Sequence, residues 1–243
     1  MRGSISLFSM LRYVLLFLSF LLISPTSVMA FPPYKSTDAD TAALSTLELR
    51  FGIVQIEHDN GSSKFISPLL RANFGIPYQL EIVSEFEYIP EDNTLGDGAV
   101  GIKWVPLRGD FSLGMETLIL LPVRNGDDDK VGLESQLVAT FPLKDRGLVI
   151  HINGGRIHDP RGNDTENGWR ASVLTELTNN PYRPGLELFT KHINGRSTDI
   201  RLGMGIIKSL GRFEFRSAVH FGLNSHSPDV IFNLWLSTNI PFN

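Results

Sequence analysis

The chain has 243 residues, no cysteine and a formal net charge of −4 at pH 7. The absence of cysteine excludes a disulfide framework and a thiolate metal site. The acidic balance argues against a nucleic-acid partner, and no motif indicates a metal or another cofactor. About 213 residues follow residue 30, enough for one domain with a sizeable core or barrel wall.

The N-terminus has the pattern of a secretory signal peptide. Arg2 and Arg12 accompany an apolar run over residues 13–23 that is interrupted by Ser19. A spanning helix needs roughly 20 apolar residues, so this run is too short to be one. Residues 28–30 (Val-Met-Ala) suit a signal peptidase, which predicts a cleaved signal peptide over 1–30. An uncleaved anchor helix is the alternative. Cleavage leaves 20 basic and 26 acidic residues, a net charge of −6.

Residues 31–43 are interpreted as a short extended lead-in, and the rest of the chain alternates between apolar and polar side chains. The alternating segments lie around 47–53, 66–74, 80–88, 100–104, 111–119, 133–141, 148–152, 169–177, 186–188, 200–206, 213–221 and 230–242. A period of two is the mark of a β-strand with two different faces. About twelve strands of roughly ten residues would cover well over half of the mature chain, whereas soluble domains average about a quarter strand.

The last of these segments is the most informative. From Val230 to Phe242 the apolar residues occupy one face and the polar residues the other, with Ile231 and Trp235 as exceptions. The final strand of a bacterial outer-membrane barrel has this pattern, because it must close the sheet and also face lipid. One amphipathic strand of a soluble sandwich would fit this stretch alone equally well.

The connections alternate between short and long. Tight turns are expected at 75–78, 107–110, 144–147 and 210–212, a somewhat longer one at 179–184, and long polar loops at 122–132 and 158–168. An even-stranded barrel with both termini in the periplasm has this asymmetry. Aromatic residues near strand ends, among them Tyr78, Trp104 and Phe242, predict two interfacial girdles.

The direction in which the polar face points distinguishes a membrane barrel from a soluble barrel. It carries many charged residues, with more arginine than lysine, and several glycines that suit a narrow interior. A soluble lipocalin-like barrel would turn this face to water, whereas a membrane barrel turns it to the lumen. The sequence therefore predicts an all-β, up-and-down transmembrane antiparallel β-barrel of about 12 strands over residues 44–243, in the bacterial outer membrane.

Three segments carry a resemblance to a known family. They are residues 36–41 (Ser-Thr-Asp-Ala-Asp-Thr), 74–88 and 95–104, within which Leu80-Glu81-Ile82 and Gly96-Asp97 through Lys103 match a family pattern. The chain resembles the outer-membrane transporter family of the meta-pathway of phenol degradation. The resemblance implies a barrel that transports small solutes, including aromatic or hydrophobic compounds. The stretch 121–126 departs from the longer Pro-Thr-Gly loop of that family, and the family supplies no catalytic residues.

Three functions fit the pattern: a pore or carrier for small solutes, a non-conducting structural or receptor barrel, and an envelope lipid hydrolase. The expected partners are outer-membrane lipids, a small-molecule solute and the barrel-assembly machinery. Charged lumen residues on early and late strands are the candidates that set permeation, because such side chains select by sign and hydrogen bonding. These candidates are Arg50, Arg71, Glu81, Glu85, Arg201 and Arg216.

The search for catalytic or metal sites gives two weak candidates. Asn224-Ser225-His226-Ser227 contains the residue types of a phospholipase site, but adjacency in sequence is not the geometry that a nucleophile and its base need. Asp127-Asp128-Asp129 could bind calcium through carboxylate oxygens, although a solvated acidic loop explains it better. We therefore expect neither an enzyme nor a metal site.

Overall fold

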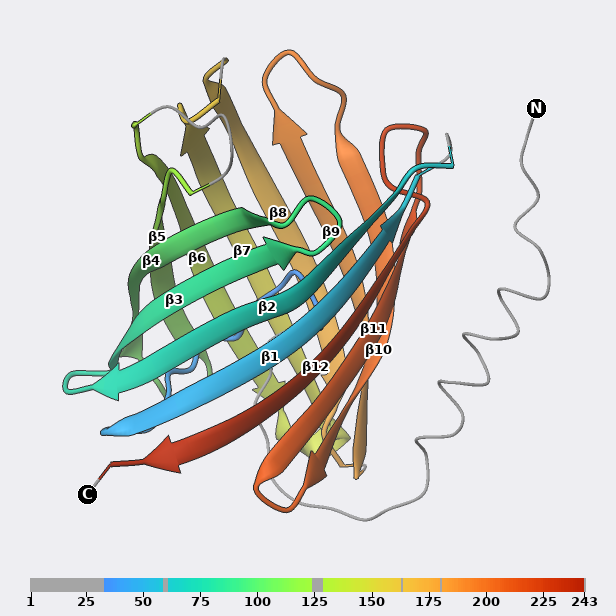
Figure 1. The fold of residues 1–243 in the computed structure, drawn as a ribbon. Helices are drawn as coiled ribbons and strands as arrows, with labels where there is room; N and C mark the ends of the chain where they lie inside the picture. The colour runs from blue at the N-terminus through green and yellow to red at the C-terminus, as the bar shows by residue number, and fades with distance from the viewer. Residues whose placement is uncertain (1–32, 59–60, 124–128, 163, 180, 243) are drawn as a thin grey trace.

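The computed structural model describes residues 33–58, 61–123, 129–162, 164–179 and 181–242, so the expected signal peptide and most of the aspartate run at 127–129 lie outside the described residues. Twelve strands follow one another: β1 (Thr46–Glu57), β2 (Ser63–Ile76), β3 (Leu80–Ile89), β4 (Thr94–Leu107), β5 (Ser112–Leu120), β6 (Gly132–Leu143), β7 (Leu148–Asp159), β8 (Glu166–Leu177), β9 (Tyr182–Ile193), β10 (Asp199–Leu210), β11 (Phe213–Gly222) and β12 (Val230–Pro241). Each strand pairs with its sequence neighbours, and β1 pairs with β12 to close the barrel (Figure 1). The predicted fold class is confirmed.

The two ends of the barrel differ. One end, at the bottom of Figure 1, holds the start of β1, the end of β12 and five connections of two to four residues each. We call this end the turn end. In its β10–β11 connection, Gly211 has a φ of 63°, a backbone conformation that glycine adopts without strain. The opposite loop end holds the longer connections, the longest between β5 and β6. The predicted alternation is confirmed, with the β3–β4 connection as short as a turn.

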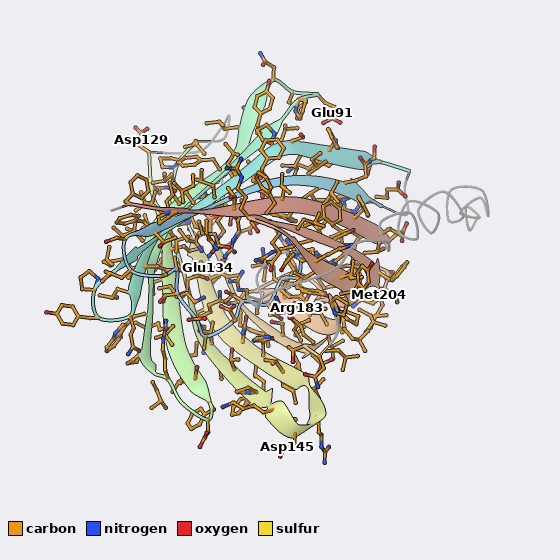
Figure 2. The ribbon with its side chains drawn as sticks, turned by 90° about the horizontal axis from the view of Figure 1, so that it is seen from below. Glu91, Asp129, Glu134, Asp145, Arg183 and Met204 are labelled. Atoms are coloured by element: carbon orange, nitrogen blue, oxygen red, sulfur yellow. The ribbon has the colours of Figure 1, made fainter. Side chains whose placement is uncertain are left out.

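The outer face of the wall is apolar, as membrane lipid requires. Leu137 is 61% exposed, and Leu186 and Leu188 are each 50% exposed. At the turn end the rings of Phe74 and Phe242 meet edge-on at 6.0 Å. Figure 2 shows Met204 at the periphery, whereas Glu134 and Arg183 lie toward the lumen. Large apolar side chains cover the outside because an unpaired charge in hydrocarbon is costly. The predicted orientation of the two faces is confirmed.

One face assignment is wrong and has a clear structural reason. The alternation placed Ile66 on the outer face, but the structure buries it in the lumen at 4% exposure. Ser67 and Pro68 together oppose the single residue Ile53 of β1, since the register shifts between Gly52 and Val54. Proline removes a ladder donor and is common at such bulges. The extra residue moves the side chains before it to the opposite face.

The bulge completes an apolar area inside the barrel. Ile231 and Trp235, the two exceptions of the last strand, point inward and pack with three residues of β1 and β2. We call this set the apolar lumen patch; it consists of Val54, Ile66, Leu69, Ile231 and Trp235. Barrel interiors are normally polar, so this patch is a feature of the lumen that needs an explanation.

The described residues contain one helical element, the 3-10 turn Lys144–Arg146 between β6 and β7. No helix in this part of the chain is long and apolar enough to cross a membrane.

Candidate functional site: a strapped lumen

Residues 33–43 lie inside the barrel, where Figure 1 shows them as a blue trace behind β1 and β2. We call this segment the lumen strap. The sequence predicts an extended lead-in here but does not indicate its location, because the segment has no strand periodicity. Most of its side chains are buried, including Tyr34 at 4% and Ser36 at 2% exposure. The strap is therefore a structural part of the lumen and not a free tail.

Glu187 of β9 is the principal anchor of the strap. Its carboxylate accepts hydrogen bonds from the backbone N–H of Lys35 at 3.0 Å and from the hydroxyl of Ser36 at 2.6 Å. His220 Nε2 of β11 lies 2.8 Å from the same carboxylate. The Ser36 hydroxyl also lies 2.7 Å from that of Ser172 on β8. Charge-assisted bonds of this kind contribute about 1.5–3 kcal/mol each.

The other half of the strap crosses the lumen toward β3. Asn153 of β7 accepts the Thr37 N–H at 2.6 Å and donates to the Thr37 carbonyl at 2.8 Å. Lys103 Nζ of β4 lies 3.1 Å from Asp38, and the Ala42 N–H donates to Glu81 of β3 at 2.7 Å. The strap therefore bonds to strands around most of the circumference of the lumen.

At the mouth of the turn end the strap becomes accessible. Asp40 lies 3.0 Å from Arg108 in the β4–β5 turn, and both side chains are about 40% exposed. Partial burial, together with the neighbouring Asp38 carboxylate, raises the pKa of Asp40 above its usual range. This pair is screened by water and contributes little to the attachment of the strap.

Glycines in the wall make room for the strap. A Cβ on Gly185 of β9 would lie 2.5 Å from the Tyr34 hydroxyl oxygen. A Cβ on Gly75 of β2 would lie 2.1 Å from the Ala43 carbonyl oxygen. Such distances exclude any larger residue unless the strap shifts. The wall is thus shaped around the strap in its present position.

A belt of ion pairs lines the wall beside the strap in the turn half of the barrel. It runs through Arg50, Glu48, Arg216, Glu214, Arg183 and Glu176, on strands β1, β11, β9 and β8. Arg50 lies 2.6 Å from Glu48 and Arg183 lies 2.5 Å from Glu176. All of these carboxylates have arginine partners, as buried charges require. The belt belongs to the wall and contains no strap residue.

The loop half of the lumen holds a cavity of about 440 Å³. This volume is in the range of small-molecule sites, roughly 300–1,000 Å³. The apolar lumen patch forms part of its wall, with Arg71, Glu85 and Arg201 among the charged groups, and strap residues 33–37 also line it. The cavity therefore combines an apolar surface with charged side chains and is bounded on one side by the strap.

Three buried polar atoms on residues lining this cavity have no hydrogen-bond partner among the described residues. They are the indole donor Trp235 Nε1, the acceptor Gln136 Oε1 and the donor Arg170 Nε. A buried unsatisfied polar group costs about 1–3 kcal/mol.

The six predicted lumen residues all point inward but do not form one ring. Arg71 and Glu85 pair at 3.1 Å and line the cavity, as does Arg201, which pairs with Asp199 of its own strand. The others lie in the turn half: Arg50 and Arg216 belong to the ion belt, and Glu81 holds the strap. The structure thus separates candidates that face a cavity from candidates that brace the closed half.

Sequence reasoning missed the residues that hold the strap. Lys103 and Glu187 are on the predicted polar face, but nothing in their spacing distinguishes them from other charges of that face. Ser36, Thr37 and Asp38 lack a periodic pattern from which to infer partners. Their contacts span more than 60 residues of sequence, and such distant pairings cannot be read from local spacing.

The candidate lipase segment is a closed turn. Asn224 Oδ1 accepts hydrogen bonds from the backbone N–H groups of His226 at 3.2 Å and Ser227 at 3.1 Å, and lies 2.8 Å from the Ser227 hydroxyl. These contacts are those of a loop held together by its own side chain. Among the described residues no group of three or more His, Asp or Glu side chains is placed to hold a metal ion.

Comparison with known proteins gives the fold. Neither a family model nor a curated protein sequence matches the chain. The structure described as "KdgM porin" is similar over 82% of this chain and 99% of its own length, with a TM-score of 0.58 and 13% identity. The COG4313 outer membrane channel from Pseudomonas putida F1 is similar over 90% and 100%, also with a TM-score of 0.58 and 13% identity. At this identity the likeness concerns the fold alone: the chain has the barrel fold of outer-membrane channels.

Proposed function

We propose that this protein is an outer-membrane channel that passes small amphipathic solutes. The observation that carries the proposal is the cavity inside the loop half, which combines the apolar lumen patch with charged side chains. The resemblance to the meta-pathway transporter family supports aromatic or hydrophobic compounds as the solutes. Export by a cleaved signal peptide over 1–30 and insertion by the barrel-assembly machinery complete the proposal.

Within this proposal the predicted residues have separate roles. Arg71, Glu85 and Arg201 contact the solute, because they line the cavity. Arg50 and Arg216 stiffen the wall through the ion belt. Glu81 acts on permeation through the strap, since it accepts the Ala42 N–H.

The second candidate is a non-conducting structural or receptor barrel. The strap and the ion belt favour it, because both place hydrogen-bonded and ion-paired side chains in the turn half of the lumen. The two candidates differ in electrical behaviour. Purified protein in planar bilayers should give discrete current steps if it is a channel, and an assembled barrel that never conducts would leave the second candidate.

The solute site can be tested by fluorescence. Of the three tryptophans, Trp104 and Trp169 are 42% and 40% exposed on the outer face, whereas Trp235 is 4% exposed in the lumen. In a Trp104→Phe/Trp169→Phe variant reconstituted in nanodiscs, benzyl alcohol should change the Trp235 emission saturably. Glucose should not, because it has no apolar body to cover the patch.

A matched substitution shows whether the response comes from the patch. Ile231→Ser in the same background removes apolar contact area beside Trp235 and should weaken benzyl alcohol binding by about tenfold. Ile240→Ser, on the outer face of the same strand, should leave the affinity unchanged. Equal responses in the two variants, or a linear response without saturation, would mean that the alcohol partitions into lipid and not into the cavity.

A further inference from the structure

We propose that the lumen strap is an internal gate, which withdraws from the barrel toward the turn end and opens the lumen. This inference rests on the proposed channel function and names its regulation. The strap separates the cavity from the turn end, since residues 33–37 line the cavity while Asp40 reaches the mouth. Withdrawal would therefore connect the cavity with that mouth.

The strap is attached in a way that allows it to leave. Its contacts with the lumen are hydrogen bonds, one buried ion pair and the apolar packing of Tyr34 and Ala39 against wall side chains, so no strand ladder must be broken within the barrel wall. Backbone pairing of the kind found between strands is confined to the C-terminal end of the strap. There Leu44 forms a bridge with Gly75, and the Ser45 N–H donates to the Gly75 carbonyl. Ser45 has a φ of 53°, so the chain turns sharply into β1 there, which makes this junction the hinge.

The wall keeps its own partners when the strap is absent. Glu187 retains His220 at 2.8 Å, and Glu81 retains Asn73 at 3.3 Å. Lys103 is the cross-strand neighbour of Glu81 on one side and of Glu116 on the other. An isolated buried charge would be strongly destabilising, and this arrangement avoids it. Withdrawal thus loses strap contacts without leaving the anchoring charges alone in the lumen.

A reversible disulfide lock tests the gate. The chain contains no cysteine, so no native thiol competes with the introduced pair. Ser36→Cys with Ser172→Cys replaces two hydroxyls that lie 2.7 Å apart, so oxidation should tie the strap to β8. Thr117→Cys with Ser135→Cys is the control, because these hydroxyls lie 3.1 Å apart on two wall strands that are already paired. Unboiled samples on a denaturing gel would verify that each variant is a folded barrel.

Planar-bilayer current is the readout. The oxidised Ser36→Cys/Ser172→Cys protein should conduct at least about tenfold less than its reduced form, since a lock that favours one state shifts a two-state population. The control pair should conduct equally in both forms. A Ser36→Ala/Asp38→Ala variant, which removes two strap anchors, should spend more time open than the unmodified protein.

The outcomes separate the two proposals. If the oxidised and reduced lock variants carry the same current, the strap is no gate, although the channel function stands. If the unmodified protein, the reduced lock variant and the loosened variant are all folded and all silent, no path exists and the channel proposal falls with the gate.

Discussion

Leu137→Arg should prevent stable assembly of the barrel, while Gln136→Arg at the preceding position should be tolerated. Leu137 lies near the middle of β6, is 61% exposed on the outer face and would place a guanidinium in lipid. Arginine at the midplane of a barrel wall costs about 2–4 kcal/mol. Gln136 points into the lumen, where its amide lies 2.6 Å from Glu116, so an arginine there would meet a carboxylate.

The two variants place the same new side chain on the same strand at nearly the same depth in the membrane. A difference in stability between them therefore depends only on whether the arginine faces lipid or the lumen. Denaturant unfolding of the barrels refolded into lipid vesicles would measure the cost, and the mobility of unboiled protein on a gel would measure assembly. Equal losses for the two variants would contradict the assignment of the outer face to lipid.

Sequence periodicity was sufficient for the wall because of a simple physical constraint. A strand that separates lipid from a polar lumen must alternate its side chains, and this holds for every strand of the barrel. The spacing of Leu186, Leu188 and Met204 is therefore enough to identify the outer face, on which all three are about half exposed. The prediction failed at Ile66, because the bulge at Ser67–Pro68 inserts a residue that periodicity cannot detect.

The site was less predictable, for two different reasons. Ile231 and Trp235 break the alternation of the last strand, and this visible violation marks the apolar lumen patch; departures from a local rule often coincide with function. The strap gives no such signal. Ser36 and Glu187 are 151 residues apart in the sequence, and the register of the strands sets which side chains meet.

The second large effect concerns the ion pairs of the lumen. Arg71→Leu should lower the free energy of unfolding by about 3–5 kcal/mol, because the buried carboxylate of Glu116 loses the arginine with which it forms its ion pair. Arg71 contacts Glu116, which is nearly inaccessible, and also Glu85 at 3.1 Å and Asn73 at 3.2 Å. Arg71→Leu with Glu116→Leu should recover much of the loss, since both charges are then removed together.

The exposed pair of Arg196 and Glu166 at the loop end is the matched control. Its atoms lie 2.7 Å apart, but the Arg196 side chain is 63% exposed, so Arg196→Leu should cost about 0–1 kcal/mol. Similar losses for Arg71→Leu and Arg196→Leu would show that the Arg71 site is solvated and that its pairs do not brace the wall.

Arg71→Lys separates bracing from solute contact, because it keeps the charge but loses the planar fork that reaches two carboxylates at once. If Arg71 contacts the solute in the cavity, this variant should change ion selectivity in planar bilayers beyond what its loss of stability explains. Arg196→Lys makes the same substitution in the exposed loop-end pair with Glu166, and Arg196 does not line the cavity. Arg196→Lys should therefore leave selectivity unchanged, and a selectivity shift as large as that of Arg71→Lys would mean that the cavity residues do not set selectivity.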